Sequence, residues 1–179
     1  MEALKAYQKK LTPIMLLFLL FLFIGGMVIM RNLSGKIAEY NDFQIILDLR
    51  LGYSFQECYS YISDLGECGR DLYKNYFFYV DFAYMLIYNT FYFSLLLFLL
   101  GKIGLEKYNC ILLFPMFSFI FDFGENLCIR QMIENFLSIP RSVCYISSIF
   151  TILKFVCTYS ALGCCCLLII VLIKQHIIK

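Results

Sequence analysis

The stretch Leu11–Met30, LTPIMLLFLLFLFIGGMVIM, decides the fold, because none of its 20 residues is charged. A helix needs about 20 apolar residues to cross the hydrocarbon layer of a membrane. Three further apolar runs of at least this length follow, at about residues 76–100, 108–129 and 143–173. The sequence therefore predicts an all-α membrane protein whose four transmembrane helices form a bundle.

The composition of the whole chain points the same way. Of its 179 residues, 61% are hydrophobic and 16% are charged, whereas a soluble domain is about 45–50% apolar. A chain of this length forms one domain, and we expect a single membrane domain over residues 1–179. The net charge of +2 is small and its basic residues are scattered, which argues against nucleic acid as a partner. The lipid bilayer is the partner that the composition indicates.

The first apolar run follows a basic tail, as the core of a signal peptide does. It is longer than the usual 7–15 apolar residues of a cleaved signal, and no small-x-small cleavage site follows before Arg31. We therefore expect an uncleaved signal anchor.

The orientation in the membrane rests on the basic residues that flank the spans. Seven lie on the side of the two termini and six on the opposite side. The seven are Lys5, Lys9, Lys10, Lys102, Lys107, Lys174 and Lys179, and the six are Arg31, Lys36, Arg50, Arg70, Lys74 and Arg141. Because basic loops favour the cytoplasm, we expect a multi-pass protein with both termini cytoplasmic. Nothing in the sequence indicates which membrane holds it.

Residues 31–75 form the only sizeable segment expected outside the membrane. Leu47, Leu49 and Leu51 alternate with charged residues, which predicts an extended, strand-like piece. Ser54 and Glu57 have the spacing of a capping box, which marks a helix start.

That capping box predicts a short amphipathic helix over about residues 55–65, ended by Gly66. We expect Phe55, Tyr59 and Ile62 to form its apolar face, resting on the membrane or on the bundle. The next helix is expected to begin near Glu67 and to run without a break into the second span.

Cysteine and histidine give little support to metal chemistry. Cys58 and Cys68 either form a disulfide in an oxidising compartment or remain free. The other cysteines lie in or beside spans, where they behave as small apolar residues. With His176 as the only histidine, the sequence predicts no metal site and no cofactor.

The segment FDFGENLCIR, residues 121–130, places polar groups where lipid is expected. Asp122, Glu125 and Asn126 share one helix face through their i, i+3, i+4 spacing. A charged residue at the centre of a membrane helix costs about 2.5–3.5 kcal/mol on insertion scales, so such residues face the bundle interior. Thr151 and Lys154 form a similar stripe on the fourth span.

These residues are expected to meet in one interior cluster, together with Asp81 of the second span. We predict that Lys154 pairs with Asp122 or Glu125. The surplus negative charge is then balanced by Arg70 or Arg130, by a proton, or by a cationic ligand.

The order of the polar motifs resembles that of a family of small four-span membrane proteins. The shared pattern is D-L-R-x-G-Y, G-x-x-G-R-x-x-Y, an Asp opening the second span, P-x(6)-D-x-x-E-N, and S-x-x-T-x-x-K, over about residues 47–155. It covers Asp48, Gly52, Tyr53, Gly66, Gly69, Arg70, Tyr73, Asp81, Pro115, Asp122, Glu125, Asn126, Ser148, Thr151 and Lys154. The resemblance implies the four-span fold and the site positions, and it implies no particular reaction.

Four functions remain open for the cluster. It is a binding or transport site for a small or lipidic ligand, or a structural network that fixes helix register. It is alternatively the site of an enzyme acting on a lipid or isoprenoid-like substrate, in which Glu125 or Asp122 acts as general acid or base. The fourth possibility is an accessory subunit of a larger membrane complex or a homo-oligomer. Whether the protein is an enzyme is left undecided by the sequence.

Overall fold

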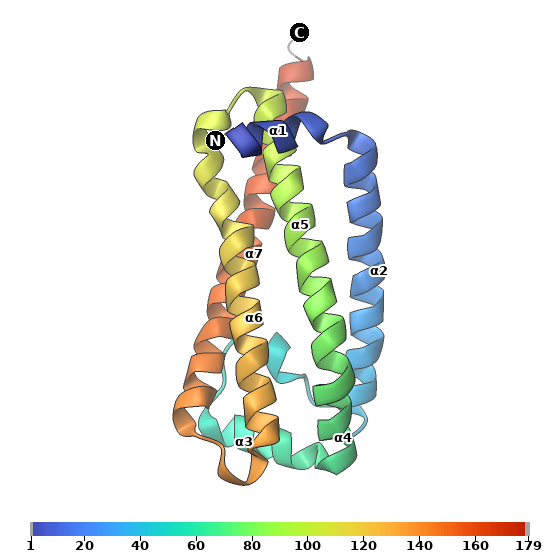
Figure 1. Ribbon diagram of the computed structural model, residues 1–179, viewed down its shortest axis with the longest axis vertical. Coiled ribbons are helices and arrows are strands. Elements are labelled where there is room, and N and C mark those ends of the chain that lie inside the picture. The colour runs from blue at the N-terminus through green and yellow to red at the C-terminus, as the bar shows by residue number, and fades with distance from the viewer. Residues whose placement is uncertain (1, 178–179) are drawn as a thin grey trace.

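Four long helices form an all-α bundle in the computed structural model, which describes residues 2–177 (Figure 1). They are α2 (Pro13–Ala38), α5 (Phe78–Ile103), α6 (Leu113–Glu134) and α7 (Arg141–Ile177), and each belongs to a helix long and apolar enough to cross a membrane. No strand occurs within residues 2–177. The predicted four-span architecture is thus confirmed.

The short helix α1 (Glu2–Lys10) lies across the end of the bundle at which α7 ends, so both chain ends lie at the same end (Figure 1). Tyr7 and Gln8 hold it there, because their side chains bond to Ser94 Oγ and to the Leu97 carbonyl of α5, at 2.8 and 3.1 Å. Lys179, counted above among the basic residues of this end, lies outside the described residues.

Helix α2 begins where the sequence supplies a start signal. The Thr12 hydroxyl accepts a hydrogen bond from the Met15 N–H, and Pro13 occupies the first turn, where its missing N–H costs nothing. The helix extends to Ala38, beyond the apolar run that ends at Met30. The other long helices also extend past the C-terminal ends of their predicted spans, because residues that follow an apolar run continue the same helix.

The second span belongs to one continuous helix over Gly66–Ile103, as predicted. It comprises α4 (Gly66–Leu72), a π-helical segment η2 (Tyr73–Phe77) and α5. The π-helical turn was not expected from the sequence. Such turns are rare and often lie near functional sites, and this one ends four residues before Asp81.

The re-entrant segment, residues 39–54 between α2 and α3 (Phe55–Asp64), turns back into the bundle. Its short 3-10 helix η1 (Leu47–Leu49) lies among the long helices (Figure 1). The predicted strand-like piece is therefore wrong. A lone segment has no neighbouring strand to pair with, so its backbone bonds locally: the N–H of Arg50 donates to the Leu47 carbonyl at 3.0 Å. Leu47 and Asp48 are buried together as a result.

The predicted amphipathic helix is present as α3 (Phe55–Asp64), with a complete capping box. Ser54 Oγ accepts from the Glu57 N–H at 3.3 Å, and Glu57 Oε2 accepts from the Ser54 N–H at 2.7 Å. Its buried residues are Cys58, Tyr61 and Ile62. Of the expected apolar face only Ile62 is fully buried, because the bundle covers α3 from a different side than the sequence suggested.

Two apolar cores fill the bundle, and the polar residues lie between them. One core contains the re-entrant segment and α3, and includes Phe77, Ile129 and Cys144. The other lies toward the chain ends and includes Met85 and Ala161. Along each of α5, α6 and α7, the polar site occupies the interval between these two cores.

The nine cysteines are all free in the structure. Cys58 is buried against the Met132 side chain, with 3.4 Å between the sulfur atoms, while Cys68 is exposed. The two thiols that the sequence left open for a disulfide are therefore not joined.

Candidate functional site

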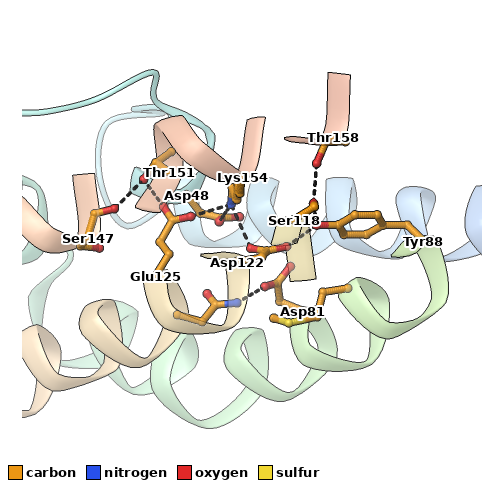
Figure 2. A network of polar contacts seen from close by, with 12 residues as sticks. Asp48, Asp81, Tyr88, Ser118, Asp122, Glu125, Ser147, Thr151, Lys154 and Thr158 are labelled. Atoms are coloured by element: carbon orange, nitrogen blue, oxygen red, sulfur yellow. Dashed lines mark hydrogen bonds and ion pairs between the residues drawn. The ribbon is translucent and has the colours of Figure 1, made fainter. Parts of the chain in front are cut away.

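The Lys154 ammonium is the centre of a buried ionic cluster (Figure 2). It forms ion pairs with Asp48, with Asp122 Oδ1 at 3.1 Å and with Glu125 Oε2 at 2.7 Å. The predicted pairing of Lys154 with Asp122 or Glu125 is found here with both carboxylates. The short helix η1 is thereby joined to α6 and α7, which lie far from it in the sequence.

In two of these carboxylates, those of Asp122 and Glu125, the oxygen that does not pair with Lys154 accepts a hydrogen bond from a hydroxyl group. Thr151 Oγ1 donates to Glu125 Oε1 at 2.5 Å, and the Tyr88 phenol donates to Asp122 Oδ2 at 2.6 Å. The Tyr88 oxygen also lies 3.3 Å from Ser118 Oγ, which is 2.6 Å from Thr158 Oγ1. Because each buried oxygen of Asp122 and Glu125 has a partner, the cluster is held in one defined geometry.

Asp81 lies beside this cluster (Figure 2) and forms a second pair with Asn126. The Asn126 amide donates to Asp81 Oδ2. Asp81 is 4% exposed, yet it takes part in none of the ion pairs found within residues 2–177, and its Oδ1 accepts no hydrogen bond there. It is a nearly buried carboxylate that lacks a cationic partner.

Asp48 is the member of the cluster that sequence reasoning did not assign to it. The residue follows an apolar run in a segment expected to lie outside the membrane, so its burial depends on the re-entrant path of the chain. Its neighbour Arg50 bonds instead to the Ile45 carbonyl at 2.8 Å and lies over the Tyr61 ring. The D-L-R-x-G-Y motif, which contains Asp48, was the one sequence signal that pointed to it.

The backbone beside Asp48 is attached to α7 through Tyr53. Its N–H donates to Ser148 Oγ at 2.9 Å and its phenol donates to Ser147 Oγ at 2.7 Å. Burial raises the pKa of the Tyr53 phenol above its ordinary value, so the group stays a neutral donor. These two bonds fix the re-entrant segment one turn away from Thr151.

Arg70 and Arg130, which the sequence offered as balancing charges, lie elsewhere. Arg70 donates to the Ile62 carbonyl at 3.2 Å and stacks on the Phe136 ring. Arg130 pairs with Glu134 at 3.1 Å and lies over the Phe78 ring. Of the predicted site residues, the structure brings together Asp81, Asp122, Glu125, Asn126, Thr151 and Lys154, and not Arg70.

The cluster carries more negative than positive charge. Asp48, Asp122 and Glu125 contact a single ammonium, and Asp81 lies beside them, all 5% exposed or less. Removing charges from water costs several kcal/mol per ion unless they are paired. A proton or a further cation is therefore needed to balance the site.

Three of the carboxylates lie close enough together to suggest a metal site. Ligand atoms of Asp48, Asp122 and Glu125 are within 4.8 Å of one another. The Lys154 ammonium already contacts all three, however, and so takes the position that a metal ion would need. This geometry favours the ammonium as the cation of the inner cluster.

A cavity of about 420 Å³ borders the cluster on the side of α2. Its polar wall contains Asp48, Asp81, Asp122 and Lys154. Its apolar wall is largely aromatic and is made by Phe23, Tyr84, Tyr88, Tyr92, Phe155 and Tyr159. Exposed lining residues come from α2, η1 and α7, namely Met27, Leu49 and Tyr159. The cavity thus opens on the flank of the bundle between α2 and α7.

Comparisons of the chain with protein-family models, with curated proteins and with solved structures give no match.

Proposed function

We propose that the protein binds a small or lipidic ligand inside the membrane, in the cavity beside Lys154. The observation that carries this proposal is the cavity itself. A purely structural ion-pair network needs no adjoining space, whereas Asp81, Asp122 and Lys154 all line a cavity of about 420 Å³. Cavities for small ligands are typically 300–1,000 Å³, mostly apolar, with a few polar groups that orient the ligand.

The position of the opening supports access from the bilayer. Met27 and Tyr159 are 48% and 62% exposed on the outer surface of α2 and α7. In a membrane this surface contacts lipid, since each of the two helices contains an apolar stretch long enough to cross the hydrocarbon layer. A ligand dissolved in the bilayer therefore reaches the charged wall without crossing water.

The test is native mass spectrometry of the protein, purified from membranes in mild detergent, as wild type and as Met27→Trp. Met27 is an exposed lining residue and takes no part in the ion pairs, so we expect the larger side chain to block the cavity rim. Met15→Trp is the matched control, because Met15 is a similarly exposed methionine on α2 that does not line the cavity. We expect a bound mass on wild type and on Met15→Trp that Met27→Trp loses.

An adduct that persists on Met27→Trp, or a wild type without any adduct, contradicts ligand binding in this cavity. In that case the ionic cluster is a structural network, and its removal affects only stability.

A further inference from the structure

We propose that the ligand of this cavity is an amphiphile with an ammonium head group. This inference rests on the proposed function and names the chemical class of its ligand. It is carried by the charges of the cavity wall, by the Asp81 carboxylate, which forms no ion pair within residues 2–177, by the aromatic lining and by the depth of the charged wall in the membrane.

The charge of the wall favours a cation. Among the described residues that line the cavity, the carboxylates are those of Asp48, Asp81 and Asp122, and the basic residue is Lys154. The Lys154 ammonium is already engaged by Asp48, Asp122 and Glu125. An anionic head group entering here would meet carboxylates and no free cation, whereas a cationic one would offset the excess negative charge.

Asp81 supplies a specific acceptor. One of its oxygens is used by Asn126, and the other has no partner within the described part of the chain. Asp81 lines the cavity, so a ligand in the cavity can reach this free oxygen. An N–H of an ammonium head group would donate a hydrogen bond to that oxygen and would also balance the charge of the Asp81 carboxylate.

The aromatic walls suit the same head group. Tyr84 and Tyr88 lie with ring centroids 5.4 Å apart, and Phe155 and Tyr159 lie 5.8 Å apart on α7. Cations bind over aromatic faces within about 6 Å, and more strongly where water is excluded. The Phe155 ring already has the Lys154 ammonium 5.4 Å from its centroid, so cations are accommodated at this wall.

The depth of the site predicts an attached apolar chain. At 1.5 Å per residue, both Asp81 and Lys154 lie about 30 Å from the basic residues at the other end of their helices, Lys102 and Lys174. That distance is about the thickness of the hydrocarbon layer. The charged wall therefore lies near the head groups of one leaflet, and Tyr92, about 16 Å from Asp81 along α5, lies toward the bilayer centre.

The experiment compares three probes with the same chain: dodecylamine, 1-dodecanol and dodecanoic acid. Their binding to the full-length protein in detergent is titrated by native mass spectrometry. We expect the amine to bind at least ten-fold more tightly than the alcohol or the acid. Asp81→Asn should lower amine binding about ten-fold and leave alcohol binding unchanged. The matched control is Glu134→Gln, an exposed carboxylate on α6 outside the cavity.

Tyr159→Leu keeps the proposal testable if Asp81→Asn fails to fold. Tyr159 is exposed, so its replacement leaves the packing of the bundle intact. Selective loss of amine binding in this variant supports the proposal.

Two contrary results have different meanings. Equal binding of all three probes, blocked by Met27→Trp, overturns the ammonium head group and leaves the proposed function standing. Binding of none of them overturns the ammonium amphiphile, and an absent co-purified mass on wild type overturns the proposed function separately.

Discussion

At the scale of single residues, Lys154 determines whether the buried carboxylates are tolerated. It is the common partner of Asp48, Asp122 and Glu125, and it is 6% exposed. Adding more charged groups to this buried site does not by itself stabilise the fold, because each group must first be removed from water. The three carboxylates are tolerated while Lys154 pairs with them, and removing Lys154 leaves their charges unbalanced.

Replacing Lys154 by Met is therefore expected to destabilise the protein strongly. Breaking a buried ion pair costs about 3–5 kcal/mol, which corresponds to a fall in Tm of about 10 °C for a chain of this size. Thermal unfolding in detergent, monitored by circular dichroism, measures this fall in Tm. Adding Glu125→Gln to Lys154→Met should recover part of the loss, and an equal or lower Tm in the double variant would contradict this account.

Glu57 gives a pH dependence that originates outside the spans. Hydrogen bonds from the Ser54 backbone N–H, and then from its side chain, lower the pKa of the Glu57 carboxyl below its ordinary value. A carboxyl whose folded pKa is lowered contributes stability above its unfolded pKa, and this contribution is lost as the pH falls through the folded value.

Wild type should therefore be more stable than Glu57→Gln at pH 7, with a difference in Tm that disappears as the pH falls below about 4. Melting curves of both proteins between pH 7 and pH 3 provide the measurement. Ser54→Ala removes the hydroxyl but keeps the backbone N–H that donates to Glu57, so in this background the same comparison should show a smaller difference that does not vanish. A difference between wild type and Glu57→Gln that stays the same from pH 7 to pH 3 would exclude the capping box as its source.

At the scale of elements, the re-entrant segment with η1 brings Asp48 to the site. Gly52 permits the turn that follows, since its φ of +88° lies in the region that side chains rarely adopt. Directly afterwards, Tyr53 bonds to Ser147 and Ser148 of α7. The position of Asp48 therefore depends on one glycine and two serine contacts.

Gly52→Ala is expected to lower the free energy of unfolding by about 1–2 kcal/mol, the cost of holding a side chain in a left-handed conformation. Gly35→Ala is the contrasting variant, because Gly35 lies inside α2 with open space around its Cα. There alanine should stabilise by about 0.5–1 kcal/mol. Chemical denaturation measures the change in the free energy of unfolding for both variants. Changes of the same sign would argue against a strained turn at Gly52.

At the scale of the whole molecule, the two ends of the bundle carry different features. The chain ends and the loop between α5 and α6 lie at one end, and α3 and α4 lie at the other (Figure 1). Basic residues favour the first end as the cytoplasmic one. The exposed thiols of Cys110 in η3 (Glu106–Leu112) and Cys68 in α4 mark the two ends.

We predict that these thiols face opposite sides of the membrane, with Cys110 cytoplasmic. In sealed vesicles whose outer face is the cytoplasmic one, a membrane-impermeant maleimide should label Cys110 and spare Cys68 until the vesicles are opened. Each thiol is read out by peptide mass spectrometry, and the single variants Cys68→Ser and Cys110→Ser serve as controls. The reverse pattern would invert the proposed orientation.

The architecture and half of the site follow from local features of the chain. Apolar runs longer than the hydrocarbon layer predicted four helices, and the i, i+3, i+4 spacing placed Asp122, Glu125 and Asn126 on one inward face, because both rules depend only on residues close in sequence. The capping box of α3 was predictable for the same reason. The resemblance to four-span proteins stays a prediction.

Tertiary structure alone decided the rest. Asp48 reaches Lys154 across 106 positions of sequence through a segment that turns back into the bundle, and no local pattern encodes that path. Arg70 and Asp81 share a helix, yet a hydrogen bond to the Ile62 carbonyl and stacking on the Phe136 ring hold Arg70 away from the cluster. The cavity likewise exists only because α2, α5 and α7 meet around it, and a space between helices is a property of their packing and of no single stretch of sequence.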